Sequence, residues 1–368
     1  MGILEDLAKA TDFQVIDEYK KPSIKIPTPS IALNGFLGGG LPTGILMETY
    51  GKPASGKSTF TYEVAARFQK DNPDGVLALI ESEASIDHLR MTQLGVDINK
   101  ALVLPSATLE GAFTQLTSLL SNMEKLSPDT PVMIIWDSIA GSPTKAQYET
   151  NNPYGGGMAE RARLIKVGLS TVLPRISKLN VLVVLINQVS ADIGGYRPTL
   201  GSSGGNAMKH DIHLKLKFGS GRTEMDGAFA TIKHSSIEID KSKISPLYKS
   251  FDITIDVSKG GKIAQIDSFL LTLSTLDIFK QGGGWYHLNP QYLEDYKEYF
   301  QSYELLLGKF RWKALVELMN ADSRLVKIFE LIWIDIVSSK YELQKIVCED
   351  YRKQLLEDLT SNEVSDSE

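Results

Sequence analysis

The sequence predicts an α/β fold in which a mainly parallel, twisted sheet lies between helices, with a short N-terminal arm and a smaller, mostly helical C-terminal domain. Two observations lead to this expectation. Short apolar runs alternate with helical patterns along much of the chain, as happens when each strand of a parallel sheet is followed by a crossover helix. One of these runs leads directly into a glycine-rich GxxxxGKS/T motif and then into a helix, which is the arrangement of a phosphate-binding loop.

The composition is that of an ordinary globular protein. The chain has 368 residues, of which 42% are hydrophobic and 23% charged, and this length favours one large domain and a smaller one. The net charge of −6 gives no general attraction to nucleic acid, so such a partner would need a local basic strip. The single cysteine, Cys348, excludes a disulfide framework. The N-terminus is acidic where a signal peptide is basic, and no apolar stretch is long enough to cross a bilayer, so we expect a cytoplasmic protein.

The apolar runs and helical patterns give the expected order of elements. Strands are expected at 45–50, 76–80, 101–104, 132–136, 181–186, 212–218, 227–240 and 250–257, the last three being candidates for antiparallel strands. Helices are expected near 59–70, 88–94, 109–126, 158–178, 265–280, 304–320 and 323–357. The domains are an arm and linker at 1–28, the core at 29–264, a C-terminal domain at 265–356, and an acidic tail at 357–368 that we expect to be disordered.

The glycine-rich motif predicts the binding site of a nucleoside triphosphate. Backbone N–H groups in such a turn converge on phosphate oxygens, and the helix that follows, from Thr59, directs its positive dipole end at them. Lys57 would reach the β- and γ-phosphates, and Ser58 would hold Mg²⁺. The alternative is a glycine-rich surface turn, which the strand before it and the helix after it disfavour. The loop residues are Gly51, Lys52, Pro53, Ala54, Ser55, Gly56, Lys57 and Ser58.

Carboxylates end two further predicted strands. Asp137 follows the run 132–136 and would complete the Mg²⁺ shell, although an aspartate here could also simply cap the strand. Glu81 and Glu83 follow the run 76–80, and hydrolysis needs one carboxylate to orient water. Both share a face of the strand, so alternation cannot choose between them. Ligands of open parallel sheets bind beyond the carboxyl ends of the strands, which favours Glu83; a pair of exposed loop acids is the alternative.

The run 181–186 ends in two amides, Asn187 and Gln188. A neutral amide at this edge can hydrogen-bond a γ-phosphate when it is present and release it when it is absent, which makes a switch. The irregular segments 149–158 and 189–206 each follow a strand at the same edge, and the second holds five glycines. Long irregular segments inside a compact domain are usually functional or disordered. We therefore expect both to be mobile and to become ordered by a ligand.

Further short motifs accompany these features. They are Gly39-Gly40-Leu41-Pro42-Thr43-Gly44, Glu81-Ser82-Glu83, Leu94-Gly95-Val96-Asp97, Asp137-Ser138-Ile139-Ala140, Ile186-Asn187-Gln188, Gly204-Gly205-Asn206-Ala207 and Lys241-Ser242-Lys243. In combination with the phosphate loop they resemble the RecA-type DNA strand-exchange recombinases, with a particular likeness to phage recombinases of the UvsX type. The similarity runs from about Ile31 to Trp285.

The resemblance implies a DNA-dependent ATPase that uses ATP and Mg²⁺, forms helical filaments on single-stranded DNA and pairs that strand with homologous double-stranded DNA. It makes Glu83 the water-activating glutamate and Gln188 the γ-phosphate sensor. Arg90 stands where the family commonly places an adenine-stacking tyrosine. Lys241 and Lys243 would reach the ATP of a neighbouring subunit. Without the resemblance, a solvated face of an alternating strand explains this lysine pair better.

By the same resemblance, the segments 149–158 and 189–206 would be DNA-binding loops. The residues expected to contact DNA are Met158 and Ile193, between nucleotide triplets, Gly204, Gly205 and Asn206, through backbone amides, and the basic Arg163. The N-terminal segment resembles a polymerisation arm, and the C-terminal domain would gather duplex. A single-strand-binding protein and a loading mediator are further implied partners, and a membrane is not. The setting would be the cytoplasm of a bacterium or of a phage-infected host.

Two other functions fit the same core. A ring-forming helicase or motor would use ATP to translocate, and closed hexamers rather than open helical filaments would identify it. A recombination mediator would bind nucleotide and a recombinase without pairing DNA itself. The complete set of Lys57, Glu83 and Asp137 favours a hydrolysing enzyme over a mediator.

Overall fold

The computed structural model describes residues 23–81, 87–139, 141–150, 158–192, 199–202, 208, 210–248 and 250–365. Most of the expected N-terminal arm and linker lies outside these ranges, as does the end of the expected tail. Within them, none of the helices has the length and apolar character that crossing a membrane requires.

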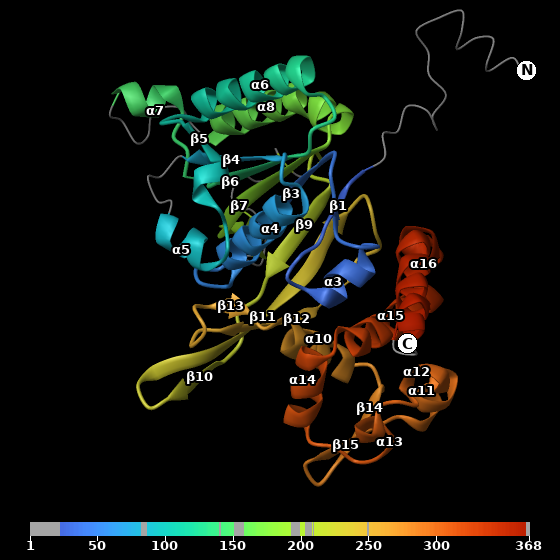
Figure 1. The fold of residues 1–368 in the computed structure, drawn as a ribbon. Coiled ribbons are helices and arrows are strands. Elements are labelled where there is room, and N and C mark those ends of the chain that lie inside the picture. Colours follow the sequence, from blue (N-terminus) through green and yellow to red (C-terminus); the bar gives the residue numbers. More distant parts are fainter. Residues whose placement is uncertain are drawn as a thin grey trace, which may run out of the picture.

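Eleven strands of the described chain form a central twisted sheet (Figure 1). Its main path runs through β13 (Lys262–Ile263), β12 (Phe251–Asp256), β11 (Phe229–Ser242), β9 (Leu214–Phe218), β3 (Ile45–Gly51), β7 (Val181–Asp192), β6 (Val132–Asp137), β4 (Val76–Glu81) and β5 (Ala101–Pro105), with β8 (Thr199–Ser202) on β7 and β10 (Thr223–Asp226) on β11. The pairs from β9 to β5 are all parallel. Antiparallel pairing begins between β9 and β11. The expected mainly parallel sheet with antiparallel strands after 212 is therefore confirmed.

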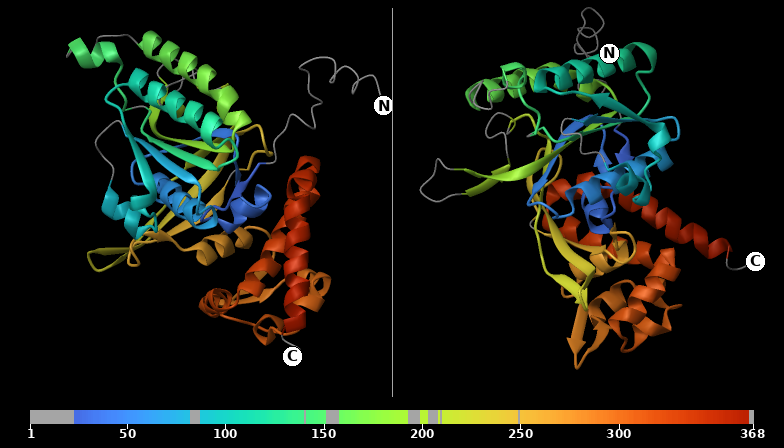
Figure 2. Two further views of the ribbon diagram at one scale, coloured as in Figure 1. Left: turned by 45° about the horizontal axis from the view of Figure 1, so that its top comes forward. Right: turned by 90° about the vertical axis from the view of Figure 1, so that its left-hand side faces the viewer.

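Helices cover both faces of the sheet (Figures 1 and 2). The helices α6 (Leu109–Leu126) and α8 (Met158–Lys178) pack on one face, over a cluster that includes Ile134 and Trp136. The opposite face, with Met133 and Ile135, packs in a second cluster, because successive residues of a strand point to opposite sides. This second layer contains α3 (Ile31–Phe36), α4 (Lys57–Asp71) and α10 (Gln265–Ser274). Shorter helices are α5 (His88–Gln93), η1 (Ile98–Lys100) and α7 (Lys145–Thr150).

Side-chain caps fix where two of the predicted helices begin. The Thr108 hydroxyl accepts a hydrogen bond from the Gly111 N–H at 3.2 Å at the start of α6. The Asp87 carboxylate accepts one from the Arg90 N–H at 2.8 Å at the start of α5. Each cap satisfies a backbone donor that the first turn of a helix leaves unpaired. The Asp87 cap matters for the site, since α5 carries Arg90.

The C-terminal region is mostly helical, as expected, but its elements differ from the prediction. Its helices are α11 (Pro290–Asp295), α12 (Lys297–Phe300), α13 (Glu304–Leu307), α14 (Trp312–Ala321), α15 (Ser323–Lys340) and α16 (Glu342–Ser365). A hairpin of β14 (Phe279–Gly282) and β15 (Trp285–Leu288) follows α10, so the helix expected to reach 280 ends at Ser274. The helix expected across 323–357 is two helices, with Tyr341 extended between them.

The expectation of a disordered tail from residue 357 is wrong for residues 357–365, which belong to α16. Leu355 and Leu359 are buried, and residues four apart lie on the same face of a helix. The Lys327 ammonium also donates to the Asp358 carboxylate at 2.9 Å. Although the segment is acidic in composition, its buried leucines pack this part of α16 against the rest of the protein.

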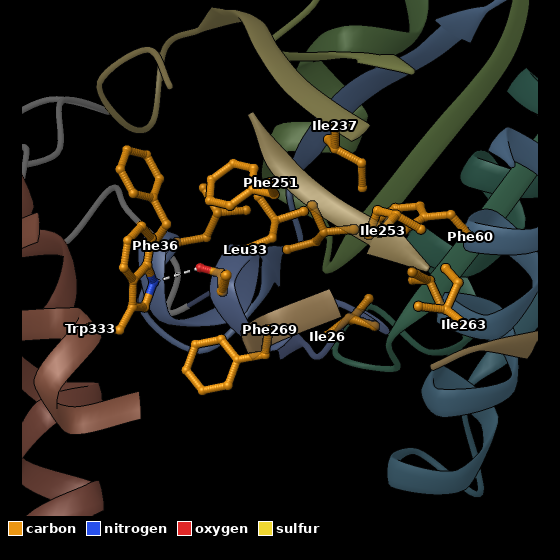
Figure 3. Packing of buried hydrophobic residues seen from close by; sticks show 14 of the residues in the cluster. Ile26, Leu33, Phe36, Phe60, Ile237, Phe251, Ile253, Ile263, Phe269 and Trp333 are labelled. Carbon is orange, nitrogen blue, oxygen red and sulfur yellow. Dashed lines mark hydrogen bonds between the residues drawn. The ribbon is translucent and has the colours of Figure 1, made fainter. Parts of the chain in front are cut away.

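The C-terminal helices hold α3 through its backbone, as Figure 3 shows for Trp333. The Trp333 indole N–H donates to the Ala32 carbonyl at 2.8 Å, and the Cys348 thiol donates to the Gly35 carbonyl at 3.1 Å. Gly35 has no room for a side chain, because a Cβ would come 2.7 Å from the Trp333 ring. Residues from both sides of the expected boundary at 264 share this hydrophobic cluster. The short strands β1 (Lys25–Ile26) and β2 (Leu41–Pro42) pair beside α3.

Trp333 should therefore contribute strongly to stability. We expect Trp333→Ala to lower the free energy of unfolding by about 3–5 kcal/mol, and Trp333→Phe, which loses the hydrogen bond to Ala32, by about 1–2 kcal/mol. Urea unfolding followed by circular dichroism measures both changes. Trp285→Phe is the control, since Trp285 is 41% exposed and its change should stay within about 0.5 kcal/mol. Equal losses for the two phenylalanine variants would contradict this account.

Candidate nucleotide and DNA site

The phosphate loop joins the centre of the sheet to α4. The strand β3, buried along its whole length, ends at Gly51, and α4 begins at Lys57 after Gly56. Gly51 lies so close to β9 that a Cβ there would come 2.5 Å from the Phe218 carbonyl oxygen. Gly56 has a φ of 100°, a conformation that favours glycine. Both glycines of the GxxxxGKS/T motif are therefore required by the local geometry, Gly51 by its close approach to β9 and Gly56 by its φ.

The side chains of this loop fit a bound phosphate. The buried Lys57 ammonium donates to the carbonyl oxygens of Gly51 at 3.0 Å and Lys52 at 2.9 Å. Burial lowers the pKa of Lys57, and the negative charge of Asp137 opposes this effect. The buried Ser55 hydroxyl has no hydrogen-bond partner among the residues that the structure describes. A triphosphate would give the ammonium and the hydroxyl acceptors, so the donor set fits the group that the sequence predicts.

The predicted site residues lie along one edge of the sheet. Gly51 pairs with Gln188 of β7, Ile186 pairs with Asp137 of β6, and Asp137 pairs with Glu81 of β4. The strands β3, β6 and β4 end at this carboxyl edge, and β7 passes through it at Gln188; ligands of such sheets bind at this edge. The structure brings Lys57, Gln188 and Asp137 to this edge, as expected. Whether Ser58 and Asp137 hold Mg²⁺ stays a prediction.

No group of three or more His, Cys, Asp or Glu side chains within the described ranges could hold a metal ion. Mg²⁺ in nucleotide sites is usually held by one or two protein groups together with phosphates and water, so this finding does not test the predicted Mg²⁺ site. Glu83 lies outside the described residues, which resume at Asp87 after Glu81. The choice between Glu81 and Glu83 as the residue that orients water therefore stays open.

Arg90 lies beside the loop, in a cavity of about 480 Å³. Its guanidinium donates to the Gly261 carbonyl at 2.8 Å, to the Thr59 hydroxyl at 3.1 Å, and to the Gly260 carbonyl. Sequence reasoning placed Arg90 here but missed the turn that closes the other side. The adjacent glycines Gly260 and Gly261 were the sequence feature that could have indicated this turn. Lining residues that the sequence did not single out are Gln93, Lys233, Ile255, Val257, Gly260 and Gly261.

A buried polar network lies behind the edge, and the sequence did not reveal it. Glu48 and Asn187 are fully buried, and the Asn187 amide donates to the Glu48 carboxylate at 2.7 Å. The Lys215 ammonium lies 3.5 Å from the other oxygen of Glu48. Burying a charge is costly unless it is paired and hydrogen-bonded. These contacts hold the Asn187 side chain in place, and Asn187 is the residue immediately before Gln188 on β7.

The two segments expected to bind DNA are only partly described. The strand β7 continues to Asp192 and pairs with β8, so part of 189–206 is a regular hairpin, which projects from the sheet in the right-hand view of Figure 2. The expectation of an irregular segment is wrong for these strands. Arg163 is exposed on α8. Several predicted DNA contacts lie outside the described residues: the side chain of Met158 and all of Ile193, Gly204, Gly205 and Asn206.

Lys241 and Lys243 lie away from the phosphate loop of their own subunit. The strand β11 runs antiparallel to β9, and Lys241 pairs with Lys215, which itself pairs with Glu48 of β3. The Lys243 N–H bonds to the His213 carbonyl at 2.8 Å. His213 in turn bonds to Leu46, five residues before Gly51. A strand rises about 3.3 Å per residue, so Lys241, which is level with Glu48, is displaced roughly 10 Å along the sheet from Gly51, and Lys243 roughly 16 Å.

The fold and the site together define a P-loop nucleotide-binding protein of the α/β class. The family model described as the RecA N-terminal domain matches residues 5–262. Protein RecA of Nautilia profundicola is 30% identical over 317 residues, which cover 84% of this chain and 87% of that protein. Protein RecA of Francisella philomiragia is 30% identical over 303 residues, 80% of each chain. Protein RecA of Methylococcus capsulatus is 31% identical over 265 residues, 71% of this chain and 73% of that protein.

This chain therefore belongs to the RecA family of recombination proteins, as its motifs predicted. Membership implies an ATP-binding protein that acts on DNA. The particular likeness to phage recombinases stays a prediction.

Lys57 should determine nucleotide affinity. We expect Lys57→Ala to weaken binding of a fluorescent ATP analogue about 10- to 100-fold, because hydrogen bonds from a charged group contribute more than neutral ones. Lys52→Ala is the matched control, since the Lys52 side chain is exposed and only its carbonyl contacts Lys57. Fluorescence titration measures both. Equal affinities for the wild type and Lys57→Ala would rule out the assigned role.

Proposed function

We propose that this chain is an ATP-dependent recombinase that assembles into helical filaments on single-stranded DNA and pairs that strand with homologous duplex. The observation that carries the proposal is the pairing of Gly51 with Gln188. It joins the phosphate loop to β7, which continues directly into the second expected DNA-binding segment. A ligand that contacts Gln188 can therefore shift the arrangement of that segment through a single strand.

In this proposal each residue at the edge has one task. Lys57 and the loop amides bind phosphate oxygens, and Ser58 and Asp137 hold Mg²⁺. When bound, ATP with Mg²⁺ would supply the phosphoanhydride bond to the γ-phosphate, and hydrolysis of this bond would release the contact between subunits. Glu83, with Glu81 as the alternative, orients a water molecule. Arg90 offers the base a planar guanidinium, which can stack on aromatic rings and is held by the carbonyls of the 260–261 turn.

We further propose that Lys241 and Lys243 act on the ATP of a neighbouring subunit. Their displacement along the sheet from their own phosphate loop supports this role. Cationic groups aimed at a γ-phosphate stabilise the charge that develops during hydrolysis. A single subunit would then have an incomplete active site, and assembly into a filament would complete it.

The DNA contacts proposed from the family are those of the two loops. Met158 and Ile193 would separate nucleotide triplets, Gly204, Gly205 and Asn206 would bind phosphates through their amides, and exposed Arg163 would add a local positive charge. The C-terminal region would gather incoming duplex. A single-strand-binding protein and a loading mediator are proposed partners.

A joint-molecule assay tests the function. Circular single-stranded DNA, homologous linear duplex, ATP and Mg²⁺ should give joint molecules that a gel resolves, whereas heterologous duplex should give none. Formation of closed rings that unwind duplex, without joint molecules, would identify a helicase instead. Stimulation of another recombinase without any pairing by this chain would identify a mediator.

Glutamine substitution should identify the residue that orients water. Glu83→Gln should abolish ATP hydrolysis and preserve ATP-dependent filament assembly, because the change removes a base and leaves phosphate and metal contacts intact. Phosphate release and electron microscopy measure the two properties. Glu81→Gln is the matched control and should hydrolyse ATP at close to the wild-type rate. The reverse pattern would assign the role to Glu81.

Subunit mixing should show that the lysine pair acts between subunits. Neither the Lys241→Ala/Lys243→Ala protein nor the Lys57→Ala protein should hydrolyse ATP efficiently when alone. A mixture should recover part of the activity, because some interfaces then combine an intact phosphate loop with an intact lysine pair. A mixture of Lys57→Ala with Lys345→Ala/Lys353→Ala, whose exposed lysines lie on α16, controls for dilution. No recovery beyond the sum of the separate activities would exclude action between subunits.

A further inference from the structure

The segment 210–213 holds both lysines that the proposed function assigns to the neighbouring active site. The Lys241 ammonium donates to the Ile212 carbonyl at 2.9 Å, and the Lys243 ammonium donates to the His210 carbonyl at 2.7 Å. In this structure, main-chain carbonyls of the same subunit therefore position the amines of both lysines. A movement of these carbonyls would move or release the two amines.

The segment is anchored to the start of β3. The Asp211 and Ile212 N–H groups donate to the Met208 carbonyl at 3.1 and 3.2 Å, and both Met208 and Ile212 are buried. The His213 N–H donates to the Leu46 carbonyl at 2.9 Å, and the Leu46 N–H donates to the His213 ring at 3.2 Å. Burial, with the positive charge of Lys243 next in effect, lowers the pKa of His213, so the ring remains neutral and accepts this bond.

Besides the apolar packing of Ile212, a side-chain ion pair connects the segment to α8. The Lys166 ammonium donates to both oxygens of the Asp211 carboxylate, at 2.9 and 2.8 Å. Lys166 lies two turns into α8, which begins at Met158 directly after the first expected DNA-binding loop. The segment 210–213 follows the second loop in sequence. The ion pair therefore connects the two segments that follow the loops, α8 and 210–213, at the place where the lysines are held.

We propose that the Lys166–Asp211 ion pair is a positioning contact that transmits DNA binding at the two loops to the carbonyls holding Lys241 and Lys243. The inference rests on the proposed function, because it concerns how DNA controls the lysines that complete a neighbouring ATP site. The Lys166 side chain is 51% exposed, whereas the Asp211 side chain is 13% exposed. A pair whose lysine is half exposed to solvent contributes little to stability, so the removal of Lys166 should alter the coupling and leave the fold intact.

The first test measures ATP hydrolysis with and without single-stranded DNA at saturating nucleotide. Lys166→Ala and Asp211→Asn should each reduce the stimulation by DNA about two- to five-fold, which is the range expected from the loss of one exposed ion pair. The double variant should lose no more than either single variant, because both changes remove the same contact. Lys166→Arg, which retains the charge, should keep most of the stimulation.

A matched control exists on the same helix. Lys178 of α8 bonds to Glu124 of α6 at 2.7 Å, and this pair is somewhat more exposed than the Lys166–Asp211 pair. Lys178→Ala therefore removes an ion pair of the same helix that lies away from the segment. It should leave the stimulation unchanged. Equal effects of Lys166→Ala and Lys178→Ala would overturn the proposal, as would unchanged stimulation in Lys166→Ala. Absence of any DNA stimulation in the wild type would count against the proposed function instead.

Hydrogen exchange gives a readout that does not depend on hydrolysis. Addition of single-stranded DNA without nucleotide should change the exchange of the amides of His213 and Lys243 in the wild type and in Lys178→Ala. The change should be lost in Lys166→Ala, although the unfolding free energies of all three proteins should agree. A DNA-induced change that persists in Lys166→Ala would show that the signal takes another route and would overturn the proposal.

Discussion

The close approach of Gly51 to the neighbouring strand is the constraint on which the site depends. A Cβ at this position would lie 2.5 Å from the Phe218 carbonyl oxygen, so only glycine lets β3 pass between β9 and β7 in the observed register. That register places Gly51 beside Gln188 and Thr49 beside Ile186, and Ile186 pairs in turn with Asp137 of β6. The phosphate loop, the Gln188 amide and the Asp137 carboxylate thus lie near one edge of the sheet. The buried bond between Asn187 and Glu48 stabilises the same register from behind.

The parallel strands bring residues together at the carboxyl edge of the sheet, whereas the antiparallel strand β11 leads its residues away from that edge. It carries Lys241 and Lys243 away from the edge where their own subunit binds phosphate, so a catalytic role for these lysines requires a second subunit. In the proposed function, hydrolysis and assembly would then be linked, since anything that orders the lysines in one subunit would affect ATP in the next. The C-terminal helices support this arrangement by fixing α3 through backbone contacts to Trp333 and Cys348. The sheet and the C-terminal region therefore share one hydrophobic core.

Local sequence patterns predicted most of the fold, whereas contacts between distant segments could not be predicted from the sequence. Apolar runs gave the parallel strands, and the glycine-rich motif gave the phosphate loop, because each is encoded by neighbouring residues. The hairpin at β14 and the helical end of α16 depend on packing partners such as Phe279 and Leu359, which composition does not reveal. The turn at Gly260 and Gly261 closes the cavity from more than 150 residues beyond Arg90, and the carbonyls that hold Lys241 and Lys243 are main-chain atoms, which carry no sequence signal.

The central claim is that nucleotide and DNA communicate through β7, and reciprocal binding tests it most directly. Fluorescence anisotropy would measure the affinity for a labelled single strand with and without a non-hydrolysable ATP analogue, in the wild type and in Gln188→Ala. The account predicts that the analogue strengthens DNA binding by the wild type, within the roughly 5- to 150-fold range typical of coupled sites. It also predicts that Gln188→Ala loses this gain and still binds the analogue. Equal gains in the two proteins would contradict the account.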